Sequence, residues 1–200
     1  MISIYSLKPR FQNMLRPLVT WLHACGTTAN QVTLAAAVVS LLIASIVAWK
    51  APLAWPFLLI PVWMFMRMAL NAIDGMLARE FGQQSRLGAY LNELCDVLAD
   101  SALYLPFALL PGVSPLLVVC VVLMAVFSEY AGVLGLMVGA TRRYDGPMGK
   151  SDRAAVFGLL GAIVGCGVTA APWLNIVFCG VLALLMYTIF NRVQRGLSHT

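Results

Sequence analysis

The chain has 200 residues, of which 61% are hydrophobic and only 10% are charged. A soluble domain of this length does not carry so much apolar surface, so the composition excludes that class and indicates an integral membrane protein. The formal net charge of +5 comes without a separate basic domain, so we expect anionic lipid headgroups as the partner and no nucleic acid.

The first 29 residues are predicted to form a head that precedes the membrane bundle. Apolar residues recur in it at helical spacing, and basic residues fall on the opposite face. The apolar set is Phe11, Met14, Leu15, Leu18, Trp21 and Leu22, and the basic set is Lys8, Arg10 and Arg16. This pattern predicts an amphipathic helix in the membrane interface. It does not resemble a signal peptide, so we expect the first span to stay in the mature protein.

Six apolar segments are each long enough to cross a bilayer as a helix, at about 20 residues per span. They cover residues 31–49, 53–79, 88–111, 115–140, 153–170 and 173–193. We therefore predict an all-α, polytopic membrane protein with six transmembrane helices. Residues 30–194 would form a single bundle domain and residues 195–200 a short tail, which leaves no room for a soluble domain.

Basic residues predict the orientation of these spans. They concentrate in the head, in or beside the connections 80–87 and 141–152, and near the tail, whereas only Lys50 lies clearly on the other side. Cytoplasmic segments of membrane proteins are enriched in Lys and Arg. Both termini are therefore predicted to be cytoplasmic.

Acidic and amide side chains gather between residues 71 and 100, at the ends of two apolar spans. A charged side chain within a membrane span is costly, so its presence there favours a functional role. At 100° per residue, the polar groups and nearby small residues share one face of each helix, within arcs of roughly 100° and 80°. The first face holds Asn71, Asp74, Gly75 and Ala78, and the second holds Gly88, Asn92 and Asp96. Converging carboxylate and amide oxygens suit Mg²⁺ or Mn²⁺, and such a cation suits a diphosphate.

The spacing of these residues resembles the signature of the CDP-alcohol phosphatidyltransferase family. That signature is DGxxARx₈GxxxDxxxD, usually with another Asp three residues upstream. Asp74-Gly75, Ala78-Arg79, Gly88 and Asp96 match it, whereas Asn71 and Asn92 stand where the family has its first and third aspartates.

Two further segments extend the resemblance over nearly the full chain. Asn30-Gln31-Val32-Thr33 resembles the family's PNxxT segment, with Ala29 in place of the proline. Gly149-Lys150-x-x-Arg153 resembles the basic stretch before the fifth span.

The resemblance implies an enzyme of phospholipid synthesis in a bacterial inner membrane, with an active site that faces the cytoplasm. It would transfer a phosphatidyl group from CDP-diacylglycerol to a small polar alcohol, release CMP and depend on Mg²⁺ or Mn²⁺. Asp96 would remove the proton from the acceptor hydroxyl. The implied metal ligands are Asn71, Asp74, Asn92 and Asp96, with Glu93 as a further candidate. The implied nucleotide-binding residues are Asn30, Thr33, Gly75, Ala78, Arg79 and Gly88, and the acceptor or phosphate would be bound by Arg142, Arg143, Lys150 and Arg153.

Other functions stay open at this point. The asparagines also fit a catalytically weak or silent relative that binds CDP-lipid or headgroups, and a CDP-alcohol:diacylglycerol phosphotransferase is the mirror-image reaction. A transporter ranks last, because the acids lie near one face and no inverted repeat is evident.

Structural roles are alternatives for several of these residues. Asn71 and Asn92 also suit interhelical hydrogen bonds, and Glu93 and Asp100 suit pairing with Arg67. Glu129 lies inside the fourth span with no obvious partner. The basic residues of the 141–152 connection can serve topology alone. The glycines at 158, 161 and 165 permit close helix packing, within the bundle or in a homodimer.

Overall fold

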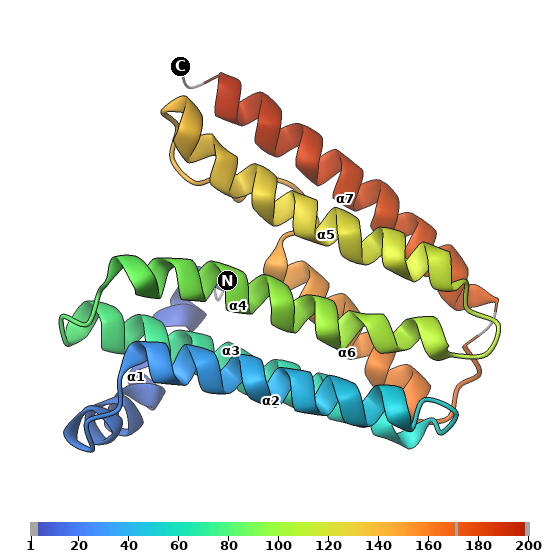
Figure 1. The fold of residues 1–200 in the computed structure, drawn as a ribbon, viewed down its shortest axis with the longest axis horizontal. Coiled ribbons are helices and arrows are strands. Elements are labelled where there is room, and N and C mark those ends of the chain that lie inside the picture. The colour runs from blue at the N-terminus through green and yellow to red at the C-terminus, as the bar shows by residue number, and fades with distance from the viewer. Residues whose placement is uncertain (1–3, 171, 199–200) are drawn as a thin grey trace. The chain divides into compact units, whose positions relative to one another are not determined.

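The computed structural model describes residues 4–170 and 172–198, and within this range the side chains of residues 4–9 are not described, so the predicted role of Lys8 lies outside it. The described chain contains helices and no strand, which confirms the all-α class (Figure 1). The α-helices are α1 (Ile4–Ala24), α2 (Ala29–Trp49), α3 (Leu59–Glu80), α4 (Arg86–Tyr104), α5 (Pro115–Leu134), α6 (Lys150–Gly165) and α7 (Trp173–Leu197). Three 3₁₀ helices accompany them: η1 (Trp55–Leu58), η2 (Leu105–Leu109) and η3 (Gly135–Val138).

Four helical segments are long and apolar enough to cross a membrane, namely Ala29–Trp49, Trp55–Glu80, Pro115–Val138 and Trp173–Leu197. The chain is therefore a membrane protein of the polytopic kind, while the count of six spans stays a prediction. α4 carries four charged residues, and α6 has only 16 residues. At 1.5 Å per residue α6 is shorter than a hydrocarbon core of about 30 Å.

Proline marks helix ends that hydropathy alone does not locate. The predicted span 88–111 is α-helical only to Tyr104, and Pro106 lies in the following 3₁₀ turn η2. Proline lacks the N–H that an α-helix needs at an interior position. At the start of α5, Pro115 is the first helical residue and the Ser114 side chain accepts a hydrogen bond from the Leu117 N–H, a typical helix start.

The chain divides into two compact units, each of which is described by itself. Unit 1 comprises the described residues of Met1–Ser40 and Trp63–Ala99, and unit 2 those of Leu41–Val62 and Asp100–Thr200. Unit 1 thus contains the described part of α1, most of α2 and α3, and α4 up to Ala99. Unit 2 contains the end of α2, η1, the start of α3, the end of α4 and the elements that follow α4.

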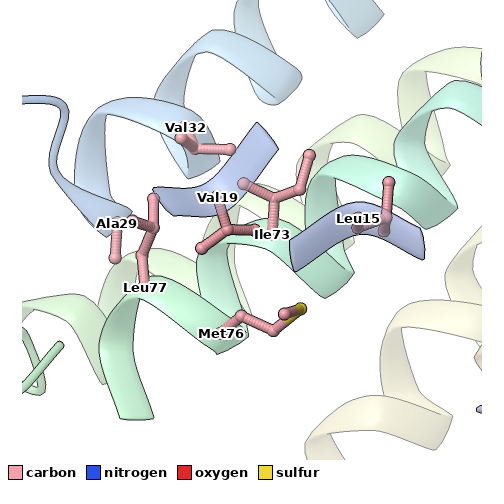
Figure 2. Close-up of a cluster of buried hydrophobic side chains, with 7 residues drawn as sticks. All are labelled: Leu15, Val19, Ala29, Val32, Ile73, Met76 and Leu77. Atoms are coloured by element: carbon pink, nitrogen blue, oxygen red, sulfur yellow. The ribbon is translucent and has the colours of Figure 1, made fainter. Parts of the chain in front are cut away.

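The core of unit 1 joins α1 to α2 and α3. Figure 2 shows the buried cluster to which α1 contributes Leu15 and Val19. Its other members are Ala29, Val32, Ile73, Met76 and Leu77. An exposed ion pair adds to this packing, because Arg16 Nη1 of α1 lies 2.7 Å from Glu80 Oε2 of α3. The head is therefore a helix that packs against α2 and α3 within unit 1, and its predicted place in the membrane interface stays a prediction.

The core of unit 2 is aromatic. Tyr104 stacks on Phe157 with ring centroids 3.8 Å apart, and Phe107 and Phe178 surround Phe157 at 5.4 and 5.8 Å. Aromatic pairs at these separations stabilise a core beyond their buried area. This cluster anchors α6 at a fixed position within the unit.

Glycines let α6 approach η1 closely. A Cβ atom at Gly161 would lie 3.0 Å from the Phe57 carbonyl oxygen, and one at Gly165 would lie 2.6 Å from the Leu58 side chain. A larger residue at Gly165 would force Leu58 to shift, and one at Gly161 would make an unusually tight contact. Of the two roles considered for the glycines at 158, 161 and 165, packing within the chain is the one that these contacts support.

Candidate functional site

Asp74 is a buried carboxylate on α3, in unit 1. Its residue exposure is only 6%, and its Oδ2 lies 2.8 Å from the Thr33 hydroxyl of α2. The same hydroxyl lies 3.1 Å from the Ala29 carbonyl oxygen, one turn back on α2. The Thr33 hydroxyl therefore helps to orient Asp74, and its predicted role in nucleotide binding stays a prediction.

Asp96 on α4 is held from α3. Its Oδ1 lies 3.3 Å from Nη2 of Arg67 and 3.4 Å from Nδ2 of Asn71. The side chain of Arg67 is 6% exposed and that of Asp96 is 19% exposed. The carboxylate that was predicted to act as the base therefore has a buried cation and an amide on one oxygen, and it retains some access from outside.

Two glycines of the motif allow close approach in unit 1. A Cβ atom at Gly75 would lie 2.8 Å from Nη2 of Arg79, so the Arg79 guanidinium folds back over the backbone beside Asp74. A Cβ atom at Gly88 would lie 2.8 Å from Oδ1 of Asn30. The spacing of the motif thus brings Asn30 to the start of α4 and Arg79 to the turn of α3 that carries Asp74, and the glycines leave room for the ends of these side chains.

The remaining motif residues lie on the same two helices. Ala78 packs partly buried against the unit 1 core, and Asn92 and Glu93 are half-buried on α4. In the part of the chain that the structure describes, no group of three or more His, Cys, Asp or Glu side chains is placed to hold a metal ion. That count does not include amides, so the predicted ligand set of carboxylates and asparagines stays a prediction.

The basic residues of unit 2 form a buried network around Glu129 of α5. Glu129 Oε1 lies 2.9 Å from Arg153 Nη2 and 3.5 Å from Arg192 Nη1, and its Oε2 lies 3.1 Å from Arg142 Nη2. Arg153 also lies 3.5 Å from Asp100. Arg153 and Arg192 are each only 1% exposed. The intramembrane acid without an obvious partner in the sequence therefore has three.

Hydrogen bonds also tie the arginines of this network to the backbone. Arg153 Nη1 donates to the Met148 carbonyl at 3.2 Å, and Arg192 Nη1 donates to the Ser128 carbonyl. Arg192 is one of the basic residues near the tail that predicted the orientation of the spans, and no motif predicted that it would be buried. The one available signal was its helical position near the end of the last apolar span.

Asp145 occupies the connection before α6, outside the apolar spans. Its Oδ1 accepts from Arg195 at 2.8 Å and its Oδ2 from Arg143 at 2.9 Å. Burial alone would raise the pKa of Asp145, but the two arginines outweigh burial and lower the pKa below its ordinary value. Arg142, Arg143 and Arg153 thus all contact carboxylates within the chain, and Lys150 begins α6 half-buried. Their predicted role toward the acceptor phosphate stays a prediction.

Three known proteins are similar to this chain, two of them over most of its length. The inner membrane protein YnbA of Escherichia coli is 45% identical over 194 residues, which cover 96% of both chains. The phosphatidylinositol phosphate synthase of Corynebacterium glutamicum is 26% identical over 96% of this chain and 88% of its own length. The archaetidylinositol phosphate synthase of Aeropyrum pernix is 32% identical over 44% of each chain.

The fold is also shared with a solved structure. The phosphatidylinositol phosphate synthase of Mycobacterium tuberculosis with CDP-DAG bound superposes with a TM-score of 0.75 at 17% identity, over 90% of this chain and 92% of that one. The family model for CDP-alcohol phosphatidyltransferase matches residues 26–191. The predicted resemblance is therefore confirmed, and the chain belongs to the CDP-alcohol phosphatidyltransferase family of membrane enzymes.

Proposed function

We propose that this enzyme transfers a phosphatidyl group from CDP-diacylglycerol to a small polar alcohol and releases CMP. The family match over residues 26–191 supports the reaction class. Two synthases of inositol phosphate lipids among the relatives, and the CDP-DAG complex among the solved structures, support a lipid donor and a polar acceptor. The observation that carries the proposal is that two carboxylates of unit 1 are oriented by polar neighbours, Asp74 by Thr33 and Asp96 by Arg67.

In this mechanism Asp96 is the base. It takes the proton of the acceptor hydroxyl, whose oxygen then attacks the β-phosphorus of the donor while the bond to CMP breaks. Contacts from Arg67 and Asn71 to one oxygen fix the orientation of the Asp96 carboxylate. A base needs a substrate proton within hydrogen-bond reach, and the 19% exposure of the Asp96 side chain leaves it accessible to a hydroxyl.

The donor set of unit 1 suits a hard divalent cation. Asp74 and Asp96 supply carboxylate oxygens, Asn71 and Asn92 supply amide oxygens, and Glu93 is a further carboxylate on α4. Oxygen ligands of this kind are those that Mg²⁺ and Mn²⁺ prefer. When bound there, the cation would act as a Lewis acid that stabilises charge on the diphosphate oxygens. Thr33 contributes by holding the Asp74 carboxylate in one orientation.

We also propose a single catalytic domain with both termini in the cytoplasm. The family match spans parts of both compact units, which supports one functional domain preceded by the α1 head. The basic residues near the head, the two connections and the tail support the orientation, and the E. coli relative is an inner membrane protein. The active site would then face the cytoplasm, where CDP-linked donors and soluble alcohols meet.

The test is release of CMP by purified protein in detergent. The protein is given CDP-diacylglycerol and Mn²⁺ with glycerol phosphate, serine, inositol or inositol phosphate, and CMP is measured for each alcohol. One acceptor should raise CMP release well above the level without alcohol, and Asp96→Asn should remove the increase. Absence of CMP with every acceptor, but turnover with a CDP-alcohol and diacylglycerol, would reverse the assignment of donor and acceptor.

A second candidate function is binding without turnover. The contact between Arg67 and Asp96 favours it, because a base engaged by a guanidinium is less available to a substrate. Binding of CDP-diacylglycerol with no CMP in either direction would assign the protein to this class. Metal-dependent CMP release would exclude it.

A further inference from the structure

The connection 81–85 between α3 and α4 holds the start of α2 through one side chain, that of Gln83. Its Oε1 accepts a hydrogen bond of 2.7 Å from the backbone N–H of Ala29, the first residue of α2. Its Nε2 lies 3.5 Å from the Thr27 carbonyl oxygen and 3.4 Å from Nδ1 of His23, near the end of α1. All of these residues belong to unit 1. A carboxamide has one acceptor oxygen and two N–H donors, and both of its ends are used here to bind the α1–α2 turn.

A local cap at the start of α2 leaves the Ala29 N–H to Gln83. The Gln31 N–H donates to Thr28 Oγ1 at 3.3 Å, and the Thr28 N–H donates to Gln31 Oε1 at 2.9 Å. This reciprocal pattern is a capping box. The first N–H groups of a helix have no partner within the helix, and the box does not serve the one of Ala29. Gln83, 54 positions further along the chain, supplies that acceptor.

Ala29 is a residue that permits this contact. It stands where the resembling family segment has a proline. Proline suits the first position of a helix because the N–H that it lacks would have no intrahelical partner there. A proline at position 29 would leave Oε1 of Gln83 without its donor. The alanine therefore replaces a residue that favours the helix start and allows a link to the connection between α3 and α4.

Two residues that were predicted to bind the nucleotide lie in the turn of α2 that begins at Ala29. Asn30 is the next residue, and its Oδ1 would lie 2.8 Å from a Cβ atom at Gly88, near the start of α4. The Thr33 hydroxyl is 3.1 Å from the Ala29 carbonyl oxygen and 2.8 Å from Asp74 Oδ2. Helices fray at their ends. A bond that fixes the first residue of α2 therefore limits the motion of both side chains.

We infer that Gln83 is a positioning residue for the nucleotide part of the donor. It joins the start of α2 to the connection between α3 and α4, and so it keeps Asn30 beside Gly88 and Thr33 beside Asp74. The inference rests on the proposed function for the identity of the donor. Gln83 acts through the backbone of Ala29, so its effect on the nucleotide is indirect.

The test measures the affinity of the purified protein for CDP, in detergent with Mn²⁺, by isothermal titration calorimetry. Gln83→Met keeps the length of the side chain and removes the carboxamide. Loss of one hydrogen bond should raise the Kd for CDP about two- to tenfold. Ala29→Pro removes the same bond from the other side and should give a similar loss. The two changes together should add no further loss, because they break one interaction.

A second measurement separates positioning from a general loss of stability. Hydrogen–deuterium exchange at residues 29–33 should become faster in Gln83→Met, whereas exchange in unit 2 should not change. In the CMP release assay the variant should raise KM for CDP-diacylglycerol and leave kcat nearly unchanged, which is the sign of lost binding to the ground state. Gln84→Ala is the matched control, because Gln84 is the exposed neighbour of Gln83, and it should change none of these quantities.

Three results would overturn the inference: unchanged exchange at residues 29–33 in Gln83→Met, an unchanged Kd for CDP despite faster exchange, or additive losses in the double variant. The proposed function fails on other evidence. CMP release by the wild type with unchanged exchange in Gln83→Met would keep the function and remove the inference. Faster exchange and weaker CDP binding in Gln83→Met, without CMP release by the wild type, would do the reverse. A wild type that does not bind CDP would overturn both.

Discussion

Glu129→Gln tests whether the buried charge network of unit 2 stabilises the fold. Glu129 contacts Arg153, Arg142 and Arg192 at 2.9, 3.1 and 3.5 Å, and its side chain is 9% exposed. Glutamine has nearly the same shape and can still accept hydrogen bonds. The substitution therefore removes one negative charge and leaves three guanidinium groups, with Asp100 as an acid 3.5 Å from Arg153.

The expected loss of stability is large because the charge network around Glu129 is buried. Removing one partner of a buried ion pair typically destabilises a protein by about 3–5 kcal/mol, since the remaining charge is no longer compensated. Here the partners Arg153 and Arg192 are each 1% exposed, so water cannot replace the lost carboxylate. We expect the free energy of unfolding to fall by about 3–5 kcal/mol.

Glu80→Gln is the matched control. Glu80 pairs with Arg16 at a similar distance, 2.7 Å, but the two side chains are 34% and 53% exposed. An exposed pair of this kind contributes about 0–1 kcal/mol. Both variants are unfolded with denaturant in detergent micelles and followed by tryptophan fluorescence. A loss for Glu129→Gln within about 1 kcal/mol of the Glu80→Gln value would refute the reasoning.

Three further predictions concern single side chains. Thr33→Val removes the hydroxyl that lies 2.8 Å from Asp74, and it should lower the free energy of unfolding by about 1.5–3 kcal/mol, the usual contribution of a hydrogen bond to a charged group. Thr33→Ser keeps the hydroxyl and should keep the stability. Equal losses in the two variants would show that the methyl group matters instead. Asp96→Asn should abolish CMP release while equilibrium binding of CDP-lipid is retained, and unchanged CMP release would remove Asp96 from the role of base. The pKa of Asp145 is held low by Arg195 against the raising effect of burial, so its stabilising contribution is complete above the ordinary value of about 3.9 and is lost as the pH falls further through the folded-state pKa. The difference in thermal midpoint between wild type and Asp145→Asn should therefore shrink below about pH 4, and a constant difference from pH 3 to 6 would contradict it.

Hydropathy predicted the long helices because a membrane span needs only a continuous apolar run. The first span, expected at 31–49, is α2 at Ala29–Trp49, and the last, expected at 173–193, is α7 at Trp173–Leu197. The ends were less predictable, because apolar character continues through turns in a membrane protein. The stretch expected at 88–111 changes from α to 3₁₀ structure near Pro106, a backbone effect that hydropathy does not detect.

The partners of the charged side chains could not be predicted. Helical periodicity gives the face and depth of a residue, but long side chains such as arginine reach several neighbours from one position. Arg67 was considered as a partner for Glu93 or Asp100, which stays a prediction, and nothing in the sequence indicated its 3.3 Å contact with Asp96. Asp100 lies near Arg153, which is 53 positions further along the chain. Such pairings depend on tertiary packing, for which one sequence gives no direct signal.

Contacts and exposure distinguish Glu129, an acid that stabilises the fold, from Asp96, the acid proposed as the general base. Each oxygen of Glu129 lies within 3.1 Å of a guanidinium, and the side chain is only 9% exposed, so both oxygens already have cationic partners in a buried place. Asp96 has its contacts with Arg67 and Asn71 on one oxygen, Oδ1, and its side chain is 19% exposed. A general base must be fixed and yet reachable. Asp96 has both properties, as the role proposed for it requires, whereas Glu129 inside α5 has only the first.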